Sequence, residues 1–100
     1  MLFIQSLIVA AFAVAQSSAS VIFTEPDFQG INTVVSADAM CTKLTGPFVD
    51  NVHSVVAGDH FKCELYFDFD CANLAGTYYQ SEYHLADAPY KAIRCLRDSQ

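Results

Sequence analysis

The chain has 100 residues, with 11 acidic and five basic side chains, three histidines and a formal net charge of −6. This length suits one domain, and an acidic balance without a basic run argues against a nucleic-acid-binding surface, which needs clustered lysine and arginine. Hydrophobic residues make up 53% of the chain and charged residues 16%, a composition that excludes a disordered acidic tail.

The first twenty residues have the composition of a secretory signal peptide. They contain no charged side chain, and small residues follow the apolar stretch at 2–15. An apolar segment of about 14 residues before a small-residue cleavage zone is typical of an export signal, and it is shorter than the roughly 20 residues of a membrane-spanning helix. We therefore expect residues 1–20 to be removed on secretion, with cleavage after Ala15 or Ala19. The mature protein is expected to be extracellular, without stable membrane insertion.

Four cysteines lie in the mature part of the chain: Cys41, Cys63, Cys71 and Cys95. An even number in an exported chain predicts two disulfides, and the spacing leaves all three pairings open. A bridge that closes a loop of about 30 residues adds about 3–4 kcal/mol, which is comparable to the net stability of a small core. The alternative is a zinc site, but the chain has no Cys-x-x-Cys and offers only His60-x-x-Cys63.

The mature part predicts short β-strands separated by turns. In residues 61–67 apolar side chains alternate with Lys62 and Glu64, which predicts a half-buried strand with Cys63 pointing inward. The predicted strands are residues 21–23, 31–35, 51–57, 61–67, 76–80 and 92–96. Many short strands with frequent turn signals are typical of a β-sandwich or barrel.

The chain repeats itself with a period of about forty residues. The segment Phe23–Gly30 (FTEPDFQG) places one aromatic residue seven positions, and another two positions, before a glycine. The segment Phe69–Gly76 (FDCANLAG) repeats this frame, and NVHSVV at 51–56 has a counterpart in PYKAIR at 89–94. A glycine permits the positive φ that a tightly folded hairpin needs. The repeat predicts two units, each with a strand, a glycine turn, a strand, an irregular stretch and a strand.

Phe-x-x-x-x-Phe-x-Gly, followed some twenty residues later by Asp-Asn-x-x-Ser, resembles the Greek-key motif of the βγ-crystallins. The resemblance covers residues 21–100 as one domain with two motifs, at about 21–59 and 60–97, and Phe67 or Phe69 would be the corner aromatic of the second. It implies an all-β sandwich of two antiparallel four-stranded sheets that exchange one strand per motif. Short additional strands are expected around 44–48 and 83–85.

The resemblance also implies a disulfide pairing. The first and last strands of a motif are antiparallel neighbours in this family, so the strand at 61–67 would lie beside the strand at 92–96. This arrangement pairs Cys63 with Cys95 and leaves Cys41 to pair with Cys71.

The sharpest ligand hypothesis is calcium. Many microbial βγ-crystallins bind it through (Asn/Asp)-(Asn/Asp)-x-x-(Ser/Thr)-Ser, and DNVHSV at 50–55 follows this pattern except at its last residue. The candidate ligands are Asp50, the carbonyl of Val52, the hydroxyl of Ser54, and Asp68 or Asp70 of the opposite hairpin. Such oxygens suit calcium, which takes six to eight of them.

The corresponding stretch of the second motif, APYKAI at 88–93, lacks the acid pair and the serine, and its Lys91 adds a positive charge. We therefore expect either no cofactor or calcium at one degraded site. The alternative interpretation is structural: Asp50 and Asn51 form a turn, and Ser54 caps a loop.

No catalytic pattern stands out. The chain has no Gly-x-Ser-x-Gly and no His-Glu-x-x-His, and its three histidines lie among strand and turn residues. We expect a secreted, non-enzymatic structural or binding protein with an unknown extracellular partner. The alternative is a secreted toxin-like or protease-inhibitor protein, because single-domain members of the resembled superfamily include microbial killer toxins and metalloproteinase inhibitors. A net charge of −6 argues against action on anionic lipid.

Overall fold

The computed structural model describes residues 19–98, so the predicted signal peptide lies outside the described residues except for its last two. Ala19 and Ser20 open strand β1 (Ala19–Glu25), two residues before the predicted domain boundary. Ser20 is completely buried, and its hydroxyl accepts a hydrogen bond of 2.9 Å from the Gly58 N–H. Within the described range, no helix has the length and apolar character needed to cross a membrane.

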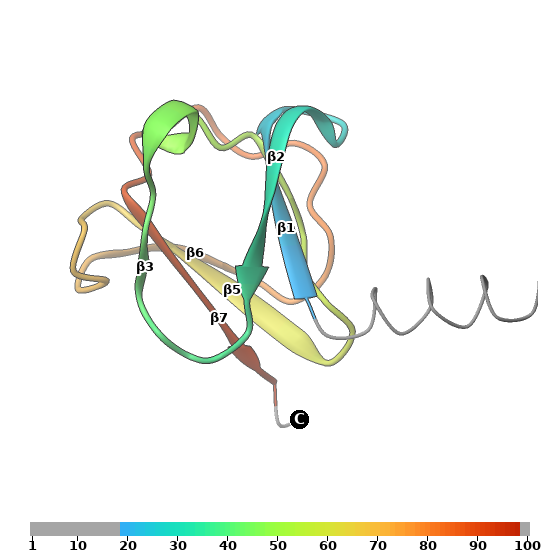
Figure 1. Cartoon of the computed structure of the whole chain (residues 1–100), viewed down its shortest axis with the longest axis vertical. Coiled ribbons are helices and arrows are strands. Elements are labelled where there is room, and N and C mark those ends of the chain that lie inside the picture. Colours follow the sequence, from blue (N-terminus) through green and yellow to red (C-terminus); the bar gives the residue numbers. More distant parts are fainter. Residues whose placement is uncertain (1–18, 99–100) are drawn as a thin grey trace, which may run out of the picture.

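Two antiparallel β-sheets pack as a sandwich (Figure 1). The first sheet has the strand order β2-β1-β4 and the second the order β3-β7-β5-β6. Besides β1, the elements are β2 (Gln29–Ser36), β3 (Thr42–Lys43), the 3₁₀ helix η1 (Gly46–Phe48), β4 (Ser54–Val56), β5 (Phe61–Tyr66), β6 (Leu74–Tyr78) and β7 (Ala92–Arg97).

The predicted exchange of strands between the sheets is present in one direction. Strand β3 of the first motif pairs with β7 of the second, with Thr42 opposite Ile93. The reverse exchange is reduced to an isolated bridge between Val55 and Glu82. The first sheet therefore has three strands instead of the expected four. The strand expected at 44–48 is replaced by η1, and the one expected at 83–85 by the bridge at Glu82.

An extra residue explains the shortened exchange. Leu44 and Leu85 hold corresponding positions, because each donates its backbone N–H to the residue just before a strand of the other motif, Lys91 at 2.9 Å and His53 at 2.8 Å. Leu44 lies two residues after the paired Thr42, whereas Leu85 lies three residues after Glu82. The added residue breaks the alternation that a continuous ladder requires.

Strand register shows how the two motifs correspond. Thr33 of β2 lies opposite Ile22, and Gly76 of β6 lies opposite the matching residue of β5. Gly76 thus corresponds to Thr33, and Asn73 corresponds to Gly30. The match between FTEPDFQG and FDCANLAG is therefore displaced by three residues. Gly30 has the expected positive φ of 82°, whereas Gly76 does not lie in the left-handed region.

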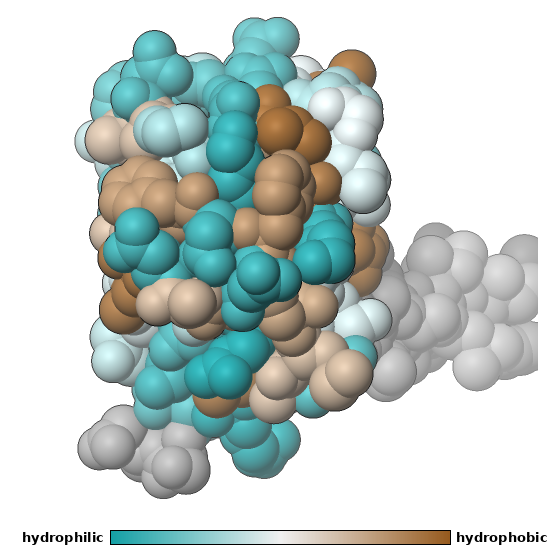
Figure 2. Space-filling model, turned by 90° about the vertical axis from the view of Figure 1, so that its left-hand side faces the viewer, coloured by the Kyte–Doolittle hydropathy of each residue, from teal (hydrophilic) through white to brown (hydrophobic). Residues whose placement is uncertain are grey.

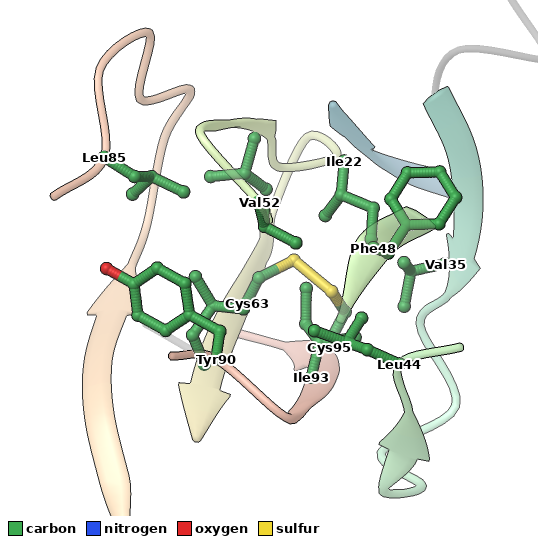
Figure 3. Packing of buried hydrophobic residues seen from close by; sticks show 12 residues of the cluster. Ile22, Val35, Leu44, Phe48, Val52, Cys63, Leu85, Tyr90, Ile93 and Cys95 are labelled. Atoms are coloured by element: carbon green, nitrogen blue, oxygen red, sulfur yellow. A yellow bond between two sulfur atoms is a disulfide. The ribbon is translucent and has the colours of Figure 1, made fainter. Parts of the chain in front are cut away.

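The hydrophobic core lies between the sheets, with one disulfide in its centre (Figure 3). Cys63 and Cys95 are completely buried, directly opposite each other in β5 and β7, with their Cα atoms 4.0 Å apart. The second disulfide joins Cys41, just before β3, to Cys71 in the β5–β6 hairpin, and so links the two motifs. This is the pairing that the resemblance implied.

The folded β1–β2 hairpin leaves no room for a side chain at Gly30. The Thr24 hydroxyl accepts a hydrogen bond of 3.0 Å from the Ile31 N–H, which holds the hairpin closed. A Cβ atom on Gly30 would overlap this hydroxyl and press against the side chain of Glu25. Gly46, in contrast, has a φ of 56° but no neighbour within 4 Å of an added Cβ.

We predict that Gly30→Ala destabilises the domain more than Gly46→Ala. Both substitutions carry the roughly 1–2 kcal/mol cost of a left-handed backbone with a side chain, and Gly30→Ala adds the overlap with Thr24. The free energies of unfolding come from urea denaturation of the oxidised proteins. Equal losses in the two variants would contradict the steric account of the hairpin.

Candidate metal site between the two motifs

The predicted calcium segment lies where the two motifs meet. Asp50 precedes β4 and has a φ of 59°. Its backbone N–H donates a 2.9 Å hydrogen bond to the carbonyl of Tyr90, so the segment at 50–54 runs beside its counterpart in the second motif. The side chain of Val52 packs in the core, as does that of Tyr90 (Figure 3).

The carboxylate of Asp50 is bound by a lysine of the other motif. The Nζ atom of Lys91 lies 2.6 Å from Oδ1 of Asp50, and the two side chains are 28% and 47% exposed. The same Nζ lies 5.9 Å from the centroid of the Phe69 ring, a cation–π distance. The positive charge of Lys91, in the second motif, thus forms an ion pair with the carboxylate of Asp50, in the first motif.

The hydroxyl of Ser54 is committed to its own hairpin. Ser54 is completely buried; its Oγ donates to the carbonyl of Glu25 at 2.7 Å and accepts from the Phe28 N–H at 3.1 Å. Both partners belong to the turn between β1 and β2. Ser54 therefore has the loop-capping role of the structural interpretation.

The two acids of the opposite hairpin also have partners within the chain. The carboxylate of Asp68 accepts hydrogen bonds from the N–H groups of Asn73, Ala72 and Asp70, the one from Asn73 measuring 2.8 Å. These bonds, that from Asn73 foremost, lower the pKa of Asp68. Oδ1 of Asp70 lies 3.5 Å from Nζ of Lys43, and both side chains are exposed.

This donor set does not fit calcium. The carboxylates of Asp50 and Asp70 each face a lysine ammonium group, and the hydroxyl of Ser54 is already bonded on both sides. Calcium takes six to eight oxygen ligands, and a fixed positive charge beside two of them opposes its binding. The residues described here contain no group of three or more His, Cys, Asp or Glu side chains arranged to hold a metal ion.

A second contact crosses between the motifs at the position that matches Lys91. The ring of His53 donates from Nδ1 to the carbonyl of Thr24 at 2.8 Å, which turns Nε2 toward Asp87 of the second motif, 3.5 Å away. No sequence motif assigned a role to the side chain of His53. The available signal was the repeat itself, since His53 and Lys91 hold the same position in NVHSVV and PYKAIR.

The surface around the β5–β6 hairpin is mixed in character. Figure 2 shows hydrophobic patches separated by hydrophilic side chains on this side of the molecule. The ring of Phe67 stacks on Tyr90 with 6.1 Å between centroids, and both Phe67 and Phe69 are about two-fifths exposed. Of these rings, that of Phe69 lies beside the ammonium group of Lys91.

A separate open groove of about 470 Å³ is lined by polar residues that include Asp59, His60 and Asp98. Nε2 of His60 lies 3.5 Å from Oδ2 of Asp59, and both side chains are more than 70% exposed. This pair is solvated, and an ion pair this exposed contributes little to stability.

We predict a measurable coupling between Lys91 and Asp50. In a double-mutant cycle of Lys91→Met and Asp50→Asn, the interaction is expected to contribute about 0.5 kcal/mol, because the pair is partly exposed and screened by solvent. Lys62→Met is the matched control, since Nζ of Lys62 also lies over an aromatic ring, that of Tyr79 at 5.6 Å. A coupling energy between Lys91→Met and Asp50→Asn equal to that between Lys62→Met and Asp50→Asn would contradict this prediction, because it would show that the ion pair does not stabilise the domain.

Three solved structures share this architecture. A βγ-crystallin domain of Abundant Perithecial Protein from Neurospora crassa, in its calcium-bound form, matches with a TM-score of 0.73 and 14% identity over 85% of this chain and 94% of that chain. A βγ-crystallin domain from Flavobacterium johnsoniae gives a TM-score of 0.71 at 13% identity, over 81% and 97%. The N-terminal domain of Protein S gives 0.69 at 17%, over 80% and 97%.

No protein-family model matches the sequence. Nor does any curated protein sequence match it. The likeness therefore rests on the arrangement of the strands, and it shows that this chain has the βγ-crystallin fold.

Proposed function

We propose that this protein is exported and acts outside the cell as a non-enzymatic structural or binding domain that does not depend on calcium. Export is supported by the uncharged, apolar segment at 1–20 and by the four cysteines, which are all paired in disulfides within the described residues. The solved structures that it resembles are crystallin-type domains.

The observation that carries the proposal is the pairing of Lys91 with Asp50. The likeness to a domain solved in a calcium-bound form makes calcium the first ligand to consider. In this chain an ammonium group lies 2.6 Å from the carboxylate that such an ion would need. The ammonium group belongs to the other motif, so it links the two motifs without any ion from solution.

Two disulfides also stabilise the domain, and the first of them joins the two motifs. Cys41–Cys71 joins the segment before β3 to the hairpin of the second motif, and Cys63–Cys95 joins β5 to β7. The sequence separations are 30 and 32 residues. Closing a loop of about 30 residues contributes about 3–4 kcal/mol in the chain-entropy model. This exceeds the roughly 2.7 kcal/mol that a ligand adds at one hundred times its Kd.

We predict that calcium leaves the thermal stability of the mature protein unchanged. The melting temperature of the oxidised protein is expected to agree within about 1 °C in millimolar calcium and in EDTA. A reductant is expected to lower the melting temperature by about 10 °C or more. The reason is that the disulfides contribute about 3 kcal/mol, and each kcal/mol shifts the melting temperature of a domain of this size by several degrees. A calcium-dependent rise of several degrees would overturn the calcium-independent part of the proposal.

The burial of Ser20 supports one of the two expected cleavage sites of the leader. Removal after Ala19 would place a charged amino group on Ser20, which is completely buried, and burying an unpaired charge is costly. We therefore predict cleavage after Ala15, so that the secreted protein begins at Gln16. The intact mass of protein secreted under its own leader measures this. A product that starts at Ser20, or one that retains residues 1–15, would contradict the prediction.

A further inference from the structure

The two disulfides lie in very different surroundings. Cys63 and Cys95 are completely buried in the centre of the core (Figure 3). Cys41, in contrast, is exposed, and Cys71 is half-buried. Disulfides are cleaved by attack of a thiolate on one of the two sulfur atoms, so the rate depends on access to the sulfur. A dissolved thiol can therefore reach the Cys41–Cys71 bridge in the folded protein, whereas the Cys63–Cys95 bridge is protected until the core opens.

A lysine ammonium group lies beside the exposed sulfur. Sγ of Cys41 lies 3.5 Å from the carbonyl oxygen of Phe69, and Nζ of Lys43 donates to the same oxygen at 3.3 Å. The same Nζ lies 3.5 Å from the carboxylate of Asp70, the residue before Cys71. This positive charge attracts an approaching thiolate, and it offsets the negative charge of Asp70, which would repel one.

The Cys41–Cys71 bridge holds residues 38–43, here called the crossover segment. In this segment the chain crosses from β2 of the first sheet to β3 of the second (Figure 1). All six of its residues are exposed, whereas Val35 before it and Leu44 after it are buried in the core. The crossover segment can therefore move without uncovering the core, because the chain is anchored by buried side chains on both sides of it.

The other anchors of the crossover segment are polar. The Ala39 N–H donates to the carbonyl of Cys95 at 3.1 Å, and β3 pairs with β7 over two residues. Ala39 has a φ of 64°, a left-handed conformation that is unfavourable for a residue with a side chain. Segments held by a few exposed hydrogen bonds open locally at a small cost in free energy. The covalent bridge is therefore what keeps the crossover segment closed.

We propose that the Cys41–Cys71 disulfide is a redox-sensitive switch: a low-molecular-weight thiol cleaves it in the folded protein, and the crossover segment then detaches from β7. Detachment leaves the backbone of β7 open along the edge that β3 covers. The switch requires neither a bound ion nor the export signal.

The reaction takes two thiols and transfers two electrons. The first thiol attacks as its thiolate at Sγ of Cys41 and forms a mixed disulfide there, while the electron pair of the broken S–S bond leaves on Cys71. The thiolate of Cys71 then takes up the proton that the attacking thiol lost. A second thiolate attacks the sulfur of the attached thiol and forms the small-molecule disulfide, and Cys41 leaves as a thiolate that is protonated in turn. Two thiols are thus oxidised to one disulfide, and the protein disulfide is reduced to two thiols.

The first test compares the reduction rates of the two disulfides. The oxidised mature protein is incubated with dithiothreitol without denaturant, and the free cysteines are alkylated at intervals and located by peptide mass spectrometry. Cys41 and Cys71 are expected to become alkylated at least about tenfold faster than Cys63 and Cys95, because the first bridge is accessible in the folded state. A smaller ratio would show that reduction requires unfolding of the domain, and it would overturn the proposal.

The second test measures the opening of the crossover segment without a reductant. In the double variant Cys41→Ser/Cys71→Ser, trypsin is expected to cleave after Lys43 at least about tenfold faster than in the oxidised wild-type protein. Lys62 is the internal control, because it lies in β5, which pairs with both β6 and β7. Within the variant, cleavage after Lys43 is expected to be at least about tenfold faster than cleavage after Lys62.

Two outcomes of the trypsin experiment would overturn the proposal. Cleavage after Lys43 that is no faster in the variant than in the oxidised wild-type protein would show that the bridge does not hold the crossover segment. Equal cleavage rates after Lys43 and Lys62 in the variant would show that the segment opens only when the whole domain unfolds, or that the variant does not fold.

Discussion

Lys91 contacts the other motif through two of its atoms and its own motif through a third. Its backbone N–H donates to Tyr66 within its own motif, and its carbonyl accepts the N–H of Leu44, which fixes the exchanged β3 segment. Its Nζ then bonds Asp50 of the first motif at 2.6 Å. One residue thus contributes a hydrogen bond beside the exchanged strand and an ion pair with the acid at the motif boundary. The rest of the sandwich, including its closed core, depends on the two motifs being held in this relation.

The two hairpins reach the same folded shape with different bonds. In the first, the hydroxyls of Thr24 and Ser54 hold the turn, and Gly30 allows the close approach. In the second, Ala92 replaces Ser54 in register, and the carboxylate of Asp68 collects three backbone N–H groups. The Cys41–Cys71 disulfide ties that second turn to the neighbouring motif. The second hairpin therefore lacks a serine hydroxyl like that of Ser54, and the carboxylate of Asp68 and the disulfide hold it instead.

The sequence predicted the fold class because its signals are local. Alternation at 61–67 placed Cys63 inward, and the repeat of about forty residues indicated two units. Their resemblance to the βγ-crystallin motif implied the Greek-key topology and the neighbouring strands at Cys63 and Cys95. The predicted register of the second hairpin was wrong, because the sequence repeat aligns Gly76 with Gly30, whereas the strand register aligns Asn73 with Gly30. A repeat of residue types does not determine the length of a turn. No sequence pattern indicated the extra residue between Glu82 and Leu85. Lys91 and Asp50 are 41 residues apart, so their contact depends on topology alone.

We propose that the ammonium group of Lys91, and not a calcium ion, satisfies Asp50 at the boundary between the motifs. Isothermal titration of calcium into the oxidised mature protein at low ionic strength tests it most directly. The account predicts no saturable binding heat up to millimolar calcium. A saturable isotherm with a micromolar dissociation constant, lost in Asp50→Asn, would show that calcium displaces Lys91 and would contradict the account.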